Sequence, residues 1–335
     1  MANQRKIPTI IDVANLAGVS ISTVSRVMNN PEKVKLETRQ KVYQAIDVLN
    51  FVPQADARAR ALHGKGRIGV ITPFFTAPSF VQRLRGIAAT LSKENFDLII
   101  YTVDSNNRLQ SYLTTLPLTG NLDGLVIVSL PVAEADVDRL LKHSLPTVLI
   151  EFPHPLLNSV EIDDEKGGMM VAEYLINKGH NRIAFLGDTD LPEYAIHPIS
   201  LRLKGFRRAL SAAKVDIPKE FVRLAPYNQE QAQIIANELL TGNNSPTAIF
   251  AATDLQALAV IKAARKLNIK IPEELAVIGF DDLDMAEYAD LTTIRQHLDE
   301  SGRIAIELLL SHIADPSRPV KHITLPLNLI ERLSA

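Results

Sequence analysis

The sequence contains no cysteine among its 335 residues. This absence excludes disulfide scaffolds, cysteine-based zinc sites and thiol nucleophiles. Apolar stretches such as Gly124–Ser129 are as long as a strand and too short to span a bilayer. The polar, basic start at Met1–Lys6 is followed by no apolar core, so we expect no secretory signal, no membrane association and a cytoplasmic protein.

Common catalytic motifs are also missing, because the sequence holds no GxxxxGK[ST], no HExxH and no GxSxG. The segment Gly64–Gly69 fits GxGxxG, but it precedes a strand and therefore lacks the geometry that cradles a phosphate. Asp188 with Asp190, and the acidic stretch Asp281–Asp290, lack the EF-hand spacing, which favours a solvated or sugar-binding role over a metal. We expect no enzyme, no metal and no cofactor.

Basic charge is concentrated at one end. Residues 1–65 hold ten basic and five acidic side chains, so they carry +5, and the other 270 residues carry −7 of a total of −2. Phosphate contact by one end of a protein requires such a basic head. On charge alone, a merely solvated basic surface is the simpler interpretation.

The first fifty residues predict three helices, over roughly 10–17, 21–28 and 37–49. Thr9 and Ser20 stand where the first two helices need caps. Ala14 is small where two helices approach, Gly18 permits the turn, and Val24 packs back from the second helix. This spacing is typical of a helix-turn-helix, and its alternative is a surface helical hairpin without a ligand.

The second of these helices carries side chains suited to DNA. Arg26 can donate two hydrogen bonds to a guanine edge, with Ile21 and Ser22 beside it on the face toward the major groove. Neighbouring hydroxyl and amide groups suit phosphates. The candidate DNA-binding residues of the head are Thr9, Ser20, Ile21, Ser22, Thr23, Ser25, Arg26 and Asn29.

From Arg67 onward, short strands alternate with helices, which predicts parallel sheets with sites at the strands' carboxyl ends. The span is long enough for two such lobes. The predicted domains are a head (1–52), a hinge helix and linker (53–66) and an effector-binding and dimerisation domain (67–335). Within the last, we expect an N-lobe of about 67–160 plus 293–320 and a C-lobe of about 161–292 plus 321–335.

The run TIIDVANLAGVSISTVSRVMNNPEKVKLETRQKVYQAIDVLNFVP resembles the head of the LacI/GalR (lactose/galactose/purine repressor) family. The family's later motifs follow in order, among them IGVITP, DGLVIVS, SLRLKGFRRAL and LTTIRQHLDESG. The resemblance implies a ligand-responsive transcription repressor with a small all-α head, a hinge and a two-lobed α/β sensor domain like that of periplasmic binding proteins. It also implies a homodimer on a pseudo-palindromic DNA operator, and the absence of a leucine heptad tail favours a dimer over a tetramer.

The hinge departs from the family pattern. The resemblance implies that the segment after Pro53 folds on DNA and presses into the minor groove, with Arg58 among its contacts. The family usually carries a leucine wedge seven residues after that proline, where this chain has Arg60. Either Leu62 serves with a shifted hinge, or Arg60 enters the minor groove electrostatically.

The resemblance also implies an effector cleft lined by Phe80, Glu151, Arg202, Thr253, Asp281 and Gln296. Carboxylates that accept hydroxyl hydrogen bonds, an arginine fork and an apolar face suit a sugar or polyol on chemical grounds alone. Taken singly, Glu151 is as well explained by a cap or ion pair, and Phe80 by the core.

Two alternatives remain. A periplasmic-type sugar-binding protein shares the two-lobed fold, but the basic head argues against it. An α/β enzyme acting on a sugar or nucleoside is disfavoured because no nucleophile–base constellation emerges.

Overall fold

The computed structural model describes residues 8–29, 31–49, 51, 66–189, 192–226, 228–242 and 244–335. The predicted hinge contacts Arg58, Arg60 and Leu62 therefore lie outside the described residues, and so does the side chain of Asn29.

The head consists of α1 (Ile10–Ala17), α2 (Ile21–Asn29), a 3-10 turn (Pro31–Lys33) and α3 (Leu36–Leu49). Its core is formed by fully buried aliphatic side chains, namely Val13, Val24, Val27, Val42 and Ile46. The αL conformation of Gly18 (φ 67°) ends α1 and turns the chain, so that α1 and α2 lie at 102° to each other. A helix-turn-helix has this angle. Among the described residues no single helix is long and apolar enough to cross a bilayer, and α1 and α2 approach that length only as this bent pair.

The first lobe is built on a six-stranded sheet in the order β11-β5-β4-β3-β1-β2, whose pairings are all parallel. Its strands are β1 (Gly66–Pro73), β2 (Phe96–Val103), β3 (Gly124–Val128), β4 (Thr147–Ile150), β5 (Asn158–Glu161) and β11 (His322–Thr324). Helices α5 (Pro78–Leu91) and α13 (Leu298–Ala314) cover one face, and α6 (Asn106–Thr119) and α7 (Glu134–Lys142) cover the other.

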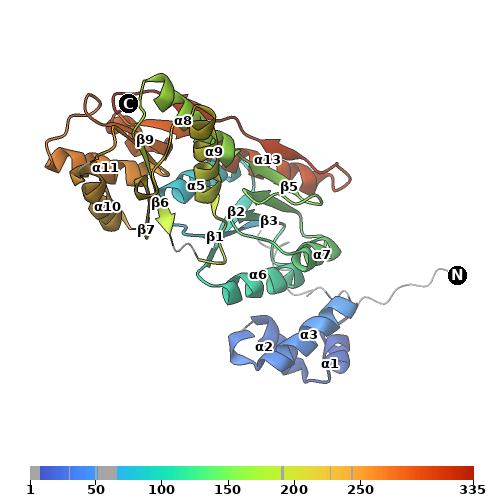
Figure 1. Cartoon of the computed structure of the whole chain (residues 1–335). Coiled ribbons are helices and arrows are strands. Elements are labelled where there is room, and N and C mark those ends of the chain that lie inside the picture. The colour runs from blue at the N-terminus through green and yellow to red at the C-terminus, as the bar shows by residue number, and fades with distance from the viewer. Residues whose placement is uncertain are drawn as a thin grey trace.

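The second lobe repeats this plan with the order β12-β10-β9-β8-β6-β7, in which only β12 is antiparallel to its neighbour. Its strands are β6 (Ile183–Thr189), β7 (Val222–Pro226), β8 (Ala248–Ala251), β9 (Ala276–Asp281), β10 (Thr292–Arg295) and β12 (Asn328–Ile330). Helices α8 (Asp164–Asn177) and α9 (Pro198–Ala212) pack on one face, and α10 (Gln229–Thr241) and α11 (Asp254–Lys266) on the other. A 3-10 turn (Lys219–Phe221) and α12 (Asp284–Tyr288) complete the lobe. These two doubly wound lobes and the helical head (Figure 1) confirm the predicted fold class.

The crossings between the lobes differ from the predicted boundaries. The sequence prediction gave 293–320 to the N-lobe and 321–335 to the C-lobe, but β10 lies in the second sheet and β11 in the first. The reason is pairing at the sheet edges: β10 extends the second sheet alongside β9, and the returning β11 pairs with β5. The chain therefore passes between the lobes after β5, after β10 and between β11 and β12.

The head contacts the first lobe, as the position of α3 beside α6 and α7 in Figure 1 illustrates. Asp47 on α3 accepts from Nη1 of Arg139 on α7 at 2.8 Å and lies 2.9 Å from Nε2 of His143, the C-cap of that helix. Leu118 on α6 joins the head's apolar cluster. These contacts attach the head to the first lobe.

Close helix pairs in both lobes depend on glycine. A Cβ atom on Gly205 of α9 would lie 1.8 Å from the carbonyl oxygen of Glu165 on α8, and one on Gly168 would lie 1.9 Å from the carbonyl oxygen of Arg202. Gly86 of α5 and Gly302 of α13 meet the partner backbone in the same way at 1.9 and 2.3 Å. Each pair thus includes one helix with a buried arginine, α9 with Arg202 and α5 with Arg83.

We expect Gly205→Ala to destabilise the second lobe by about 1–3 kcal/mol, because the added methyl group must force two packed backbones apart. Gly242→Ala is the matched control, since its added Cβ would meet no atom closer than 3.7 Å. Urea unfolding measures both variants. Equal stability of the two would contradict the tight α8–α9 contact.

Candidate functional site

In each lobe, the strand register aligns several polar side chains in a row at the carboxyl ends of the strands. In the first sheet Val128 pairs with Ile150, so the next residues, Ser129 and Glu151, lie side by side beyond the strand ends. In the second sheet the pairs Leu186–Ala251 and Phe250–Ile278 extend to the row Asp188, Thr253 and Asp281. Both rows lie at carboxyl ends of parallel strands, where open α/β sheets bind ligands.

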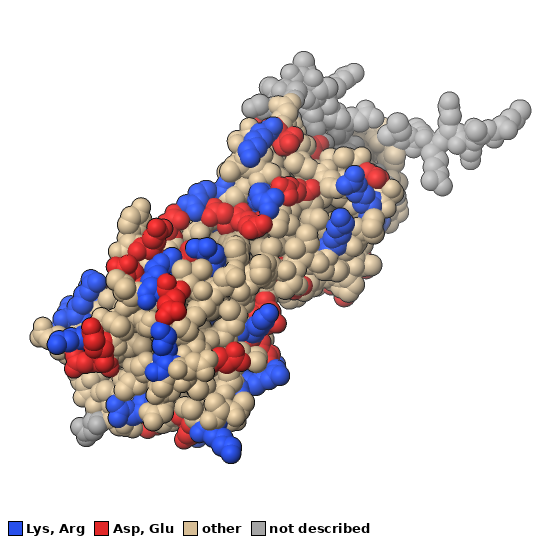
Figure 2. All heavy atoms as spheres, turned by 90° about the horizontal axis from the view of Figure 1, so that it is seen from above, with Lys and Arg blue, Asp and Glu red and all other residues tan. Residues whose placement is uncertain are grey.

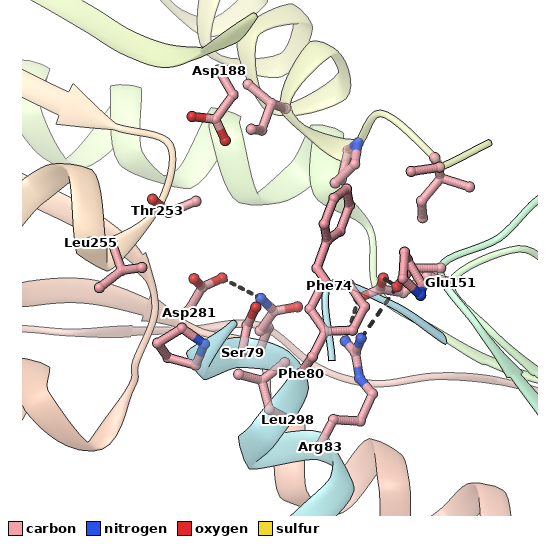
Figure 3. A pocket seen from close by; sticks show the side chains of 18 of the residues that line it. Phe74, Ser79, Phe80, Arg83, Glu151, Asp188, Thr253, Leu255, Asp281 and Leu298 are labelled. Carbon is pink, nitrogen blue, oxygen red and sulfur yellow. Dashed lines mark hydrogen bonds and ion pairs between the residues drawn. The ribbon is translucent and has the colours of Figure 1, made fainter. Parts of the chain in front are cut away.

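A cavity of about 100 Å³ lies between these two rows (Figure 3). All six predicted effector residues line it: Phe80, Glu151, Arg202, Thr253, Asp281 and Gln296. Its further polar lining, which sequence reasoning did not assign to the effector, consists of Ser79, Arg83, Ser129 and Asp188. The cavity therefore draws on both lobes and mixes charged with apolar side chains.

In the first lobe, a buried ion pair joins Arg83 of α5 to Glu151. Arg83 is 4% exposed and also donates from Nε to Ser301 Oγ at 3.0 Å, while Ser129 donates its hydroxyl to the second oxygen of Glu151. Burial alone would raise the pKa of Glu151, but Arg83 and Ser129 outweigh it, and the pKa is lowered. Glu151 is therefore a carboxylate that already has partners.

In the second lobe, Arg202 of α9 is held from several sides. Its Nε donates to Asp164 Oδ1 at 2.8 Å, and its Nη1 donates to the carbonyl oxygen of Ala252 at 2.6 Å. The guanidinium carbon lies 3.6 Å from the ring centroid of Phe280, a cation–π stack. Arg202 Nη1 is 3.9 Å from Asp281 Oδ1. The side chain is thus fixed before any ligand arrives.

Asp281 is 5% exposed and accepts a hydrogen bond from the Gln296 amide. Burial raises its pKa to about 7, although Arg202 and Gln296 oppose the shift. The same cause raises the pKa of Asp188 to about 6, against the influence of Arg202 and Gln256. Two carboxyl groups of the cavity therefore resist ionisation while no ligand satisfies them.

The loop that carries Asp281 has a strained backbone conformation, which hydrogen bonds and ion pairs hold in place. Asp281 has φ 125° and Asp282 φ 55°, values that non-glycine residues rarely adopt. The buried Asp254 carboxylate accepts from the backbone N–H of Leu283 at 2.7 Å. Asp282 forms ion pairs with Arg295 at 2.6 Å and Arg332 at 2.7 Å. These contacts hold a backbone conformation that points Asp281 into the cavity.

The remaining wall is apolar. Phe74 and Phe80 meet edge to face at a centroid distance of 6.0 Å, and Ile199, Leu255 and Leu298 line the other sides. Thr253 caps α11, its hydroxyl accepting from the Gln256 backbone N–H at 3.3 Å. A largely apolar cavity with a few fixed polar groups is typical of small-molecule sites. Among the described residues no group of three or more metal-ligating side chains could hold an ion.

The head presents the predicted reading surface on α2. Ile21 is 47% exposed, and Ser22 and Arg26 are exposed beside it. The other candidates of the head serve partly as caps. Thr9 closes a capping box with Asp12, and Ser20 Oγ lies 2.8 Å from the hydroxyls of Ser22 and Thr23. Thr23 and Ser25 are half-buried.

The sensor domain shows no continuous basic patch on the face in Figure 2. Lys and Arg side chains are interspersed there with Asp and Glu over that surface. Phosphate contact by this face would bring acidic groups against the DNA backbone. The charge on this side therefore favours the head as the DNA-binding end.

An exposed helix-turn-helix on a two-lobed domain with a buried polar cavity defines a ligand-responsive DNA-binding regulator. Residues 9–54 match the family described as bacterial regulatory proteins, lacI family, and residues 172–335 match the periplasmic binding protein-like domain. The chain belongs to the lacI family and is a transcriptional regulator, not an enzyme.

Three relatives illustrate the similarity. The ribose operon repressor of Escherichia coli K12 is 32% identical over 98% of this chain and 99% of its own length. A LacI family regulator from Enterococcus faecalis V583, solved with bound ribose, is 31% identical with a TM-score of 0.69, over 80% of this chain and 98% of its own. The lac repressor dimer bound to operator and the anti-inducer ONPF is 25% identical with a TM-score of 0.68, over 98% of this chain and 99% of that one.

The raised pKa of Asp188 predicts a pH dependence of stability. Folded Asp188 keeps its proton up to about pH 6, whereas the unfolded group loses it near its ordinary value of 3.8. In that window the native state binds more protons, so the free energy of unfolding falls as pH rises, by roughly 1–3 kcal/mol from this group.

Asp188→Asn removes the titration. We expect the wild type to lose more stability than this variant between pH 4 and 7 in thermal unfolding. His180, whose pKa is lowered by burial, contributes in the opposite sense but equally in both proteins. Parallel curves for the two proteins would contradict the buried, unsatisfied state of Asp188.

Proposed function

We propose that this regulator senses a sugar or sugar derivative in the cavity between its lobes. The observation that carries the proposal is that the cavity unites Asp281 and Arg202 with the apolar wall around Phe80. Carboxylate and guanidinium groups can hold ring hydroxyls while an aromatic face packs against the ring. Ribose in the Enterococcus faecalis relative and cellobiose in the transcriptional regulator CelR, which is 28% identical, support this ligand class.

We further propose that it acts in the cytoplasm as a homodimer, with two heads on a pseudo-palindromic operator in nucleoid DNA. Residues 1–52 would form the DNA-binding head, 53–66 the hinge and 67–335 the sensor and dimerisation domain. Ile21, Ser22 and Arg26 would read bases, with Thr9, Ser20, Thr23, Ser25 and Asn29 on the surrounding backbone. Arg58, with either Arg60 or Leu62, would enter the minor groove. The lac repressor dimer bound to operator supports this arrangement.

The effector acts through the difference between open and closed lobes. Phe80 and Glu151 come from the first lobe, whereas Arg202, Thr253 and Asp281 come from the second. A ligand that contacts both sets is bound more tightly when the lobes are closed, and only this difference in affinity can shift the equilibrium. Because the head contacts the first lobe at Asp47, a change between the lobes alters how two heads are presented in a dimer.

A mobility-shift assay with the full chain tests this function. The protein is incubated with genomic fragments, the retained fragments are sequenced, and the assay is repeated with a panel of sugars. We expect specific retention of pseudo-palindromic sites and a change in affinity with at least one sugar. Retention no better than that of an unrelated acidic protein would contradict DNA binding, and indifference to every sugar would contradict the ligand class.

Replacement of Arg26 by alanine tests the reading helix. We expect Arg26→Ala to relax base preference at one operator position, at a cost of about 1–3 kcal/mol. Lys41→Ala is the control, because Lys41 is an exposed basic residue of the head that pairs with Glu37 on α3 at 2.8 Å. Binding curves on operator variants measure both. An equal loss at all base pairs in the two variants would show that Arg26 supplies charge only.

A further inference from the structure

Asp188 is a cavity carboxylate for which neither the fold nor the predicted effector set accounts. It stands at the end of β6, in one row with Thr253 and Asp281. It lines the cavity between the lobes and also an adjoining cavity of about 340 Å³. Figure 3 shows its side chain across the cavity from Phe80, on the same wall as Thr253 and Asp281. A ligand between the lobes therefore meets two carboxyl groups on this wall.

Each of these carboxyl groups is paired with a glutamine. Gln256 donates its amide N–H to Asp188 Oδ1, and Gln296 donates in the same way to Asp281 Oδ1. The two glutamine side chains are buried, with 6% and 3% exposure, and their Oε1 atoms have no hydrogen-bond partner within the described residues. A buried amide oxygen without a partner costs free energy that a ligand donor can recover. Each Asp–Gln pair thus provides oxygen atoms that can accept a hydrogen bond from a ligand.

Most donor groups of the two cavity arginines are already engaged. Arg202 donates to Asp164 and to the Ala252 carbonyl, and Arg83 donates to Ser301 and Glu151. A ligand must therefore bring hydrogen-bond donors to Asp188, Asp281 and Gln296, which line the cavity, whereas Gln256 lines the adjoining one. An uncharged polyol does so with its hydroxyl groups.

We propose that Asp188 and Gln256 form a second accepting subsite, and that the effector is an uncharged polyol bridging Asp188 and Asp281. The two residues stand two strands apart, which places their backbones about 10 Å from each other. This inference rests on the proposed effector function and narrows it.

The subsite also defines what the cavity rejects. A phosphate ester or a sugar acid would place its negative charge against the carboxylates of Asp188 and Asp281 and the amide oxygen of Gln296. Arg83 is already paired with Glu151, and Arg202 is already paired with Asp164. Repulsion between like charges lowers the affinity for a ligand, as steric overlap does. Asp188 is accordingly a specificity-determining residue.

The experiment uses the full chain and matched ligand pairs at pH 8. The probes are ribose with ribose 5-phosphate, glucose with glucose 6-phosphate, and galactose with galacturonate, each followed by thermal shift and calorimetric titration. We expect binding among the uncharged members only. Asp188→Asn should weaken the binding of the best uncharged probe by about 10- to 100-fold, because a hydrogen bond to a charged acceptor is lost. Asp216→Asn is the control, an equal change of charge at an exposed position outside the cavity, and should bind like the wild type.

Several results would overturn the proposal. These are binding of a phosphate ester or sugar acid in preference to its uncharged partner, binding of none of the uncharged probes, and unchanged affinity in Asp188→Asn. The comparison of ligand pairs uses the wild type and stands even if that variant misfolds. A mobility-shift assay separates this inference from the proposed function. Release of DNA by an anionic sugar would overturn the role of Asp188 alone, whereas binding of a polyol without effect on DNA would overturn the proposed function.

Discussion

The buried guanidinium of Arg202 is the interaction on which the sensor domain depends. A cation that is 4% exposed persists only where its hydrogen bonds and charge are satisfied. Asp164 from α8, the Ala252 carbonyl after β8 and the Phe280 ring on β9 provide this, so one side chain ties three elements together. Its nearness to Asp281 limits how far burial raises the pKa of that carboxyl group. The charges of the cavity are therefore organised by a residue whose Nε and Nη1 atoms already donate within the second lobe.

Both lobes position a cavity carboxylate in the same way. Parallel strands deliver Glu151 in one sheet and Asp281 in the other to matching rows, and both residues have positive φ angles, 69° and 125°. Such strain persists only where the surroundings determine it, and it gathers at binding sites. The glycine contacts of α8 with α9 and of α5 with α13 bring the arginine-bearing helices close enough to hold these loops. The strained loops therefore depend on the close packing of the helices beside them.

Much of this was predictable from the sequence, for identifiable reasons. The head helices follow from Gly18 and the apolar spacing, and the main strands follow from apolar runs between helices. The crossings at β10 and β11 were misplaced because the sheet that each of these short strands joins is decided by its pairing with β9 or β5, which the local sequence does not reveal. Arg83 reads as one more helical arginine, because its burial depends on Ser301, 218 residues away in sequence. Asp188 was weighed with Asp190 as a metal pair, with a solvated or sugar-binding role favoured, but it was not joined to Asp281, since the row that unites them exists only once β8 lies between their strands.

The carboxyl groups of the two lobes differ in how far they are paired within the protein, and this difference determines where a ligand can gain hydrogen bonds. Glu151 is neutralised within the first lobe by Arg83, so its charge is satisfied whether the lobes are open or closed. Asp188 and Asp281 lie in the second lobe, and their pKa values are raised although each accepts a hydrogen bond from a glutamine. A ligand that fills the space beside them can add further donors. The first lobe supplies Phe74 and Phe80 as the opposing surface. Under the proposed function, binding energy would therefore arise when the ligand's donors reach the second lobe and its ring packs against the first, a combination that requires the lobes to be closed.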